Sequence, residues 1–156
     1  MKISLSTLVL GLAVAFGAPA MAANTATVNQ TGYNNDAGIT QAFNDSGMSS
    51  ISQNGTYNVA ISNQQDNDSA TSSIIQKNYS NFANVNQTNT DLARSTVMQD
   101  GTYNVAKVKQ WDGTNLLSSV SQTGYGNYAN VSQTGMNQTA SVTQAGTYNV
   151  ANISQK

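Results

Sequence analysis

The 156-residue sequence contains no cysteine, no histidine and no glutamate, and proline occurs once, at Pro19. Without cysteine no disulfide framework stabilises the fold, so the backbone and side-chain ladders must do so. Histidine and cysteine are also common acid–base, nucleophilic and metal-binding groups. Neither a G-x-S-x-G motif nor a phosphate-binding loop motif occurs in the sequence. We therefore expect no enzyme, no metal site and no cofactor.

Charge is scarce as well, because charged residues make up 8% of the sequence and the formal net charge is −1. No basic field exists to attract nucleic acid or anionic lipid, and no constellation of residues indicates a small-molecule substrate. Asparagine, glutamine, serine, threonine and glycine fill much of the chain instead. Such a composition favours either disorder or a stacked β architecture that tends to self-associate.

The amino-terminal residues 1–22 have the pattern of a secretory signal peptide. Lys2 supplies the positive charge, an apolar run extends from Leu5 to Phe16, and Ala20 and Ala22 form an A-x-A cleavage site. A membrane anchor is the rival interpretation, but the apolar run is short for a membrane span. We expect a mature chain that begins at Ala23, with a short segment at 23–25 before the repeats of 26–156.

Glutamine recurs at a fixed interval along the rest of the chain. Two sets of six glutamines each follow one another at 23, 23, 23, 23 and 22 residues. The first set is Gln30, Gln53, Gln76, Gln99, Gln122 and Gln144, and the second is Gln41, Gln64, Gln87, Gln110, Gln133 and Gln155. A fixed period of this length is typical of repeat architectures. The six copies run approximately over 26–48, 49–71, 72–94, 95–117, 118–139 and 140–156.

Other residue types keep the same interval. An asparagine column consists of Asn35, Asn58, Asn81, Asn104, Asn127 and Asn149. Successive side chains of a strand point to opposite faces, so the spacing of these columns puts them all on one face. A column two residues after the first glutamine consists of Gly32, Gly55, Asn78, Gly101, Gly124 and Gly146. Glycine and asparagine tolerate positive φ, so this column predicts the tight reversal between the two strands of each repeat.

These patterns predict an all-β protein, a β-solenoid of six stacked strand-turn-strand rungs with 22–23 residues per repeat. The second connection, such as 42–48 or 111–117, is expected to be longer and more variable. Inward glutamines and asparagines of neighbouring rungs should form ladders of hydrogen bonds, because an unpaired buried amide costs about 1–3 kcal/mol. Only the first and last rungs would lack a partner, so the same ladder would serve for self-assembly into a filament.

The repeat Ser-x-x-x-Gln-x-Gly-x-x-Asn-x-Ala-x-x-x-Gln, seen at 95–110 and again at 118–133, resembles the curlin repeat of curli fibre subunits. The resemblance covers 26–155, with Ala26 and Ala140 in place of serine and Asn78 in place of glycine. It implies a secreted functional amyloid of the biofilm matrix, similar to the major fibre subunit. Its implied partners are other copies of the chain, a nucleator subunit, and an outer-membrane secretion pore with its accessory factors.

The resemblance also implies a location: an extracellular fibre, of the pilus or fimbrium type, on the surface of a Gram-negative bacterium, reached through the periplasm. Such fibres would serve adhesion and surface colonisation. Two alternatives stay open. The chain is a nucleator subunit in one of them, and in the other it is a soluble β-solenoid adhesin that does not polymerise.

Aspartates lie mainly in the earlier repeats, and repeats five and six contain none. The candidates for gatekeepers that slow premature assembly are Asp66, Asp68, Asp91, Asp100 and Asp112. The competing interpretation is that aspartate simply suits turns. Tyr57, Tyr103 and Tyr148 share one turn position and are expected to pack over the turn.

Overall fold

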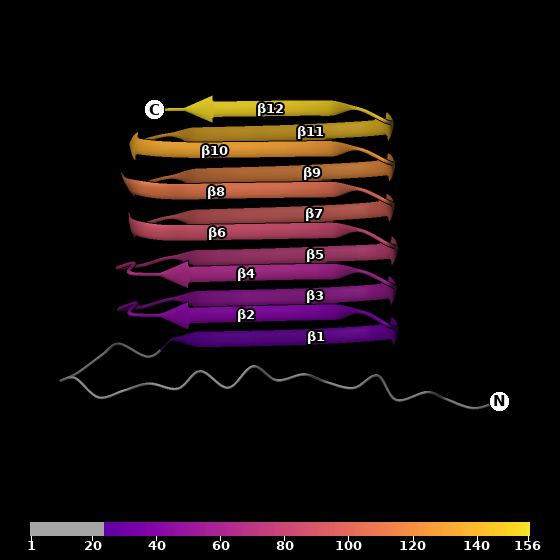
Figure 1. Cartoon of the computed structure of the whole chain (residues 1–156), viewed down its shortest axis with the longest axis horizontal. Coiled ribbons are helices and arrows are strands. Elements are labelled where there is room, and N and C mark those ends of the chain that lie inside the picture. Colours follow the sequence, from indigo (N-terminus) through magenta and orange to yellow (C-terminus); the bar gives the residue numbers. More distant parts are fainter. Residues whose placement is uncertain (1–23) are drawn as a thin grey trace.

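The computed structural model of the chain describes residues 24–156, and the signal peptide predicted at 1–22 lies outside the described residues. The described part consists of twelve strands in two six-stranded parallel sheets (Figure 1). The order in one sheet is β1-β3-β5-β7-β9-β11, and in the other it is β12-β10-β8-β6-β4-β2. Within 24–156, no helix is long and apolar enough to span a membrane.

The strands have similar lengths, and each odd-numbered strand forms a rung with the even-numbered strand that follows it. Rung one consists of β1 and β2, and rung six of β11 and β12. The bounds are β1 (Thr25–Tyr33), β2 (Asp36–Ala42), β3 (Met48–Thr56), β4 (Val59–Gln65), β5 (Thr71–Tyr79), β6 (Phe82–Asp91), β7 (Arg94–Thr102), β8 (Val105–Thr114), β9 (Leu117–Tyr125), β10 (Tyr128–Met136), β11 (Thr139–Thr147) and β12 (Val150–Gln155).

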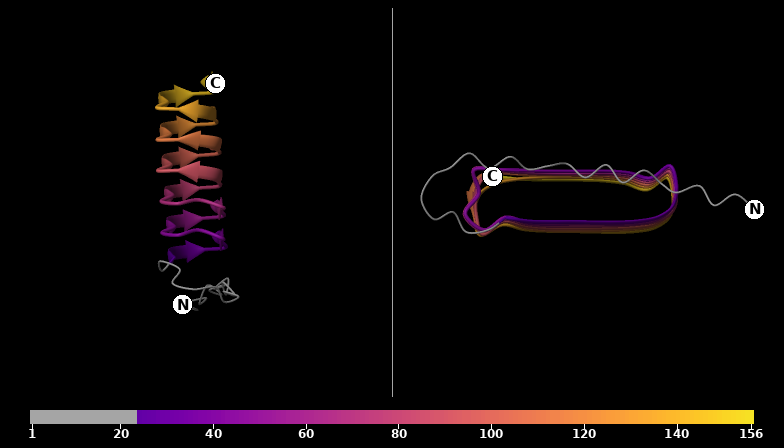
Figure 2. Two further views of the ribbon diagram at one scale, coloured as in Figure 1. Left: turned by 90° about the vertical axis from the view of Figure 1, so that its left-hand side faces the viewer. Right: turned by 90° about the horizontal axis from the view of Figure 1, so that it is seen from below.

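Each rung lies directly above the previous one, as the left panel of Figure 2 shows. Viewed along the stack, in the right panel, a rung is a flat closed loop with two long sides and two narrow ends. Residues one repeat apart are register partners, for example Gln53 with Gln76 and Ala60 with Ala83. The β-solenoid of six rungs predicted from the sequence is confirmed.

The interior between the two sheets is narrow and holds small or β-branched apolar side chains. Ile51, Ile74 and Val97 from the first sheet are fully buried, as are Ala60 and Val85 from the second. Buried and more exposed positions alternate over the first six residues of strands such as β5 and β6. The period-two pattern of the sequence therefore identifies the buried face correctly.

The tight reversal lies slightly later than the sequence predicted. Gly32, Gly101 and their column have positive φ, but they belong to the ends of the odd strands. The direction of the chain changes in the next two or three residues, at Asn34–Asn35 and at Tyr103–Asn104. A Cβ atom at Gly101 would lie 2.0 Å from the carbonyl oxygen of Gly124 in the next rung. The glycines are therefore required by close backbone stacking as well as by φ.

The second connection is longer only in the first two rungs, where residues 43–47 and 66–70 join the strands. In rungs three to five the even strands extend to Asp91, Thr114 and Met136, and two residues suffice for the turn. The loose connection predicted at 111–117 is therefore wrong, because most of that segment belongs to β8. Leu92, Asn115 and Asn137 make these tight turns with φ between 56° and 58°.

The stacking of the glycines can be tested by adding a methyl group. We expect Gly124→Ala to lower the free energy of unfolding by about 1–3 kcal/mol, because φ is +111° and the new Cβ would meet Gly146 O at 2.1 Å. Gly38→Ala is the matched control, since nothing lies within 4 Å of its Cβ position. Urea unfolding of the dilute monomer measures both. Equal losses in the two variants would contradict the requirement for close stacking.

Candidate functional site

Two columns of glutamine side chains run through the interior, one from each sheet. Between consecutive rungs, the Nε2 of one glutamine donates to the Oε1 of the next at 2.7–2.9 Å. The eight glutamines of rungs two to five are at most 1% exposed. In rung order the columns are Gln30, Gln53, Gln76, Gln99, Gln122 and Gln144, and Gln41, Gln64, Gln87, Gln110, Gln133 and Gln155.

In the ladder glutamines other than Gln30, the amide nitrogen also donates to a backbone carbonyl of the opposite sheet. Gln53 Nε2 in β3 also donates to the carbonyl of Asp36 in β2 at 2.9 Å, and Gln64 Nε2 in β4 donates to the carbonyl of Met48 in β3 at 3.1 Å. The same bonds recur in the rungs above. A carbonyl oxygen only accepts, so these bonds determine which end of each side chain carries the nitrogen. Every glutamine of a column therefore points in the same direction.

The asparagine column lies at the first turn, and its hydrogen bonds run in the opposite direction. Asn58 donates from both its backbone N and its Nδ2 to Asn35 Oδ1 in the rung below, each at 3.1 Å. Its Nδ2 also donates to the carbonyl of Asn78 in the rung above at 3.0 Å. The pattern continues along Asn35, Asn58, Asn81, Asn104, Asn127 and Asn149.

The two ends of the stack present complementary groups. Within 24–156, Gln30 Oε1 and Gln41 Oε1 at the β1–β2 end accept no hydrogen bond. At the β11–β12 end, Gln144 Nε2 and Gln155 Nε2 each donate to a backbone carbonyl but to no glutamine. Asn149 Oδ1 at that end accepts from no other described residue. One end therefore offers glutamine acceptors, and the other offers glutamine donors.

Six tyrosines form an aromatic column along the edge that contains the first turns. Consecutive rings meet edge to face, with centroids 5.3–5.9 Å apart and interplanar angles of 80–87°. In rung order they are Tyr33, Tyr57, Tyr79, Tyr103, Tyr125 and Tyr148. Edge-to-face aromatic pairs contribute about 0.5–1.5 kcal/mol each beyond the area they bury.

Only half of this column, the tyrosines of the even rungs, was predicted from the sequence. Tyr33, Tyr79 and Tyr125 were missed because they lie three residues after the first glutamine of their repeat, whereas Tyr57 and Tyr103 lie four residues after it. The sequence signal for the column is that the tyrosine lies alternately three and four residues after the first glutamine of successive repeats. This alternation offsets each ring from its neighbours, so that the edge of one ring can meet the face of the next.

The even-rung tyrosines adopt a left-handed backbone conformation, with φ of 58°, 57° and 54° at Tyr57, Tyr103 and Tyr148. This conformation is costly for a bulky residue and persists only where the surroundings determine it. The rings are close enough to influence each other's ionisation. Charge repulsion from Tyr79 is the largest of the causes that raise the pKa of Tyr103.

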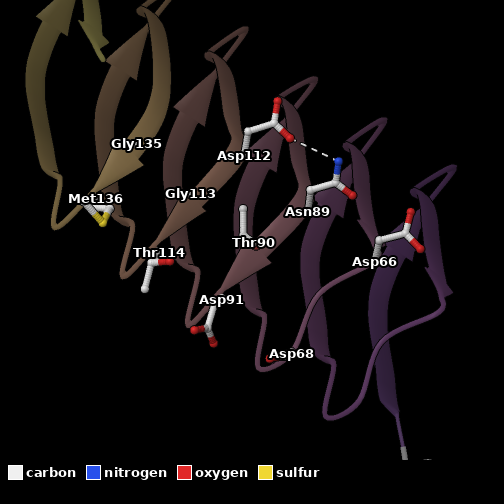
Figure 3. Close-up of a pocket in the computed structure, with 10 residues that line it drawn as sticks. All are labelled: Asp66, Asp68, Asn89, Thr90, Asp91, Asp112, Gly113, Thr114, Gly135 and Met136. Atoms are coloured by element: carbon white, nitrogen blue, oxygen red, sulfur yellow. Dashed lines mark hydrogen bonds between the residues drawn. The ribbon is translucent and has the colours of Figure 1, made fainter.

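Four of the five gatekeeper candidates lie together at the edge of the second turns. Asp66, Asp68, Asp91 and Asp112 line an open hollow of about 500 Å³ (Figure 3). Asn89 Nδ2 donates to Asp112 Oδ1 at 3.1 Å. Among the described residues, no three acidic side chains are arranged to hold a metal ion.

Asp100 lies apart from this group, near the end of β7, where it accepts a 2.7 Å hydrogen bond from Asn78 Nδ2. The five candidates therefore form one cluster of four residues and one separate residue.

The contribution of the glutamine ladder to the free energy of unfolding can be tested with a substitution in a central rung. Gln99→Ala removes the acceptor of Gln76 Nε2, the donor to Gln122 Oε1 and the donor to the carbonyl of Phe82. We expect the free energy of unfolding to fall by about 2–4 kcal/mol, because buried groups lose their partners. Gln65→Ala is the control, since this side chain is exposed and donates a hydrogen bond to its neighbour Asp66. Urea unfolding measures both, and a loss below about 1 kcal/mol for Gln99→Ala would contradict the importance of the ladder.

The family model of the curlin associated repeat matches residues 113–146, which extend from the end of β8 into β11. Searches among curated proteins and among solved structures give no significant match. The glutamine, asparagine and glycine columns of the matched segment continue through the other rungs in the same register. The resemblance predicted from the sequence is thus confirmed over residues 113–146, and the chain contains a curlin associated repeat.

Proposed function

We propose that this chain is a secreted structural subunit that polymerises by end-to-end stacking into an extracellular amyloid fibre. The fibre would serve the biofilm matrix, adhesion and surface colonisation, and the chain itself would act in assembly rather than in catalysis. The observation that supports this function best is the complementarity of the two open ends. Donors at the β11–β12 end match acceptors at the β1–β2 end.

Hydrogen-bond polarity favours one mode of stacking over the others. In a head-to-tail contact, Gln144 and Gln155 of one copy donate to Gln30 and Gln41 of the next. Two identical ends would instead bring donors to donors or acceptors to acceptors, and buried unpaired amides cost about 1–3 kcal/mol each. The open strand edges add backbone groups that need partners. A head-to-tail contact without a closing rotation produces a filament.

The partners and the location rest on the curlin repeat. We propose a nucleator subunit and an outer-membrane secretion pore with accessory factors as partners, and the surface of a Gram-negative cell as the site of the fibre. Residues 1–22 would direct the chain to the periplasm. Antibody labelling of intact cells that express the chain tests this location, and signal confined to the cell interior would contradict it.

Polymerisation can be measured directly on the chain from Ala23 to Lys156, diluted from denaturant. We expect thioflavin T fluorescence to rise after a lag, preformed fibres to abolish the lag, and the product to give a cross-β layer spacing of about 4.8 Å. Growth without any lag would favour the nucleator alternative. A stable β-rich monomer that never assembles would overturn the proposal in favour of the soluble adhesin.

A charged substitution at the donor end sharpens this experiment. Gln155→Glu keeps an acceptor for Gln133 Nε2 but removes the donor that the next copy would need. Its carboxylate would also face the Oε1 of the next Gln41. We expect seeded elongation at least tenfold slower than with Gln65→Glu, which introduces the same charge at an exposed position away from the ladders. Equal elongation rates in the two variants would mean that the glutamine ladder does not contribute to fibre growth.

The acidic hollow provides a test of the gatekeeper hypothesis. The double variant Asp66→Asn, Asp112→Asn removes two like charges from the second-turn edge of the stack. We expect its lag to be several-fold shorter than that of Asp36→Asn, Asp100→Asn, which changes the net charge equally but leaves that edge unchanged. Asp66 and Asp112 have positive φ, a conformation that asparagine tolerates as aspartate does. Equal lags would mean that aspartate only serves the turns.

A further inference from the structure

The tyrosine column at the edge of the first turns is open to solvent along its whole length. Its six rings are between 39% and 69% exposed, yet each meets the ring of a neighbouring rung edge to face. The chain has seven tyrosines, and all but Tyr128 lie in this column. A reagent in solution can therefore reach every ring of the column, and each ring has another phenol beside it.

The column continues through every rung despite backbone strain. The fourth residue after the first glutamine has positive φ in all six rungs. In the odd rungs this residue is Asn34, Ser80 or Gly126, and the tyrosine precedes it. In the even rungs the tyrosine itself adopts the left-handed conformation, to which asparagine or glycine would be better suited. Strain of this kind is typical of functional positions, so the unbroken row of phenol rings calls for a function of its own.

The contact geometry suits the oxidative coupling of two phenols. A tyrosine that loses one electron and one proton becomes a radical, and its unpaired electron is shared with the two ring carbons next to the phenol carbon. The ring centroids of Tyr79 and Tyr103 are 5.6 Å apart, and those of Tyr125 and Tyr148 are 5.3 Å apart. The phenols of Tyr125 and Tyr148 are also close enough for a side-chain hydrogen bond, which is the largest cause that raises the pKa of Tyr125. Because exposed side chains rotate freely, two such ring carbons can meet.

We propose that the tyrosine column is a modification site, at which a haem peroxidase with hydrogen peroxide joins tyrosines of neighbouring rungs as dityrosine. Each of two phenols loses an electron and a proton to the oxidant, and the two radicals form a carbon–carbon bond between the rings. The hydrogens on the two bonded carbons then leave as protons, and the two phenol oxygens are protonated again. Two tyrosines and one hydrogen peroxide thus give one dityrosine and two molecules of water.

The product would tie consecutive rungs together covalently. Partners in the column are one repeat apart in the sequence, so each bond closes a loop of one rung and restricts the unfolded chain as a disulfide would. The chain has no cysteine that could form such a tie or compete for the oxidant. Because the bonds form within one chain, this inference does not rest on the proposed polymerisation.

Two variants that each keep two tyrosines test the site. One keeps Tyr79 and Tyr103, which are in contact, and the control keeps Tyr79 and Tyr125, which are similarly exposed but two rungs apart. Every other tyrosine is changed to phenylalanine (Tyr→Phe), which retains the ring. Folded monomers isolated by gel filtration are treated with haem peroxidase and hydrogen peroxide, and dityrosine fluorescence is measured in the monomer fraction.

We expect about tenfold more dityrosine in the first variant, since the shorter loop alone would favour it only about threefold. A ratio no greater than the loop length predicts, or dityrosine only between chains, would overturn the inference.

The chain with all its tyrosines gives a second measurement that does not depend on these substitutions. Trypsin cleaves after Lys77, Arg94 and Lys107, so peptides 78–94 and 95–107 contain one tyrosine each, Tyr79 and Tyr103. We expect mass spectrometry to find these two peptides joined, with the loss of two hydrogen atoms.

Tyr128 is the internal control in the same digest. It is half-buried at the start of β10, where Lys107 Nζ lies 5.8 Å from the centroid of its ring. Fragmentation of peptide 110–156 should therefore place its bonds at Tyr125 or Tyr148. Equal bonding at Tyr128, or the absence of the joined peptides 78–94 and 95–107, would contradict the proposed site.

Discussion

The need to pair buried amides determines most of this structure. A glutamine in a narrow interior has a donor group and an acceptor group that water cannot reach, and leaving either unpaired costs about 1–3 kcal/mol. An identical glutamine directly above and another directly below meet that need, as in the column through Gln76, Gln99 and Gln122. The backbone must then follow in parallel register, with a nearly constant number of residues per rung. Glycine is required where neighbouring turns approach closely, as at Gly101.

The same constraint explains which features could be predicted from the sequence. The columns that begin at Gln30, Gln41 and Asn35 recur strictly, and this recurrence defines the rung. It also identifies the inward face, because successive side chains of a strand point to opposite faces. The full tyrosine column was not predicted from the sequence, because Tyr33 and Tyr57 occupy different positions of the repeat. Only the three-dimensional turn makes these positions equivalent.

Turns were harder to predict for another reason. Glycine tolerates positive φ, but Gly32 uses that freedom within a strand end, and Asn34 makes the bend. At the second turn, the tight form is made by Leu92 or Asn115, residues that have no turn chemistry in common. Backbone hydrogen bonds to the adjacent rung, such as Asn115 N to the carbonyl of Asp91 at 2.8 Å, stabilise that conformation. These hydrogen bonds come from the neighbouring rung, so the residues of the turn itself do not predict its conformation.

The acidic hollow would recur once per subunit along an assembly of stacked chains. Asp66, Asp68, Asp91 and Asp112 occupy the second-turn edge of rungs two to four, and rungs five and six have no aspartate. Amyloids of a single short peptide repeat their charge at every layer. Chains of six rungs stacked end to end would instead carry one acidic band per subunit, about 29 Å apart at about 4.8 Å per layer. The assembly would be striped along its axis, with counter-ions concentrated in bands separated by nearly neutral surface.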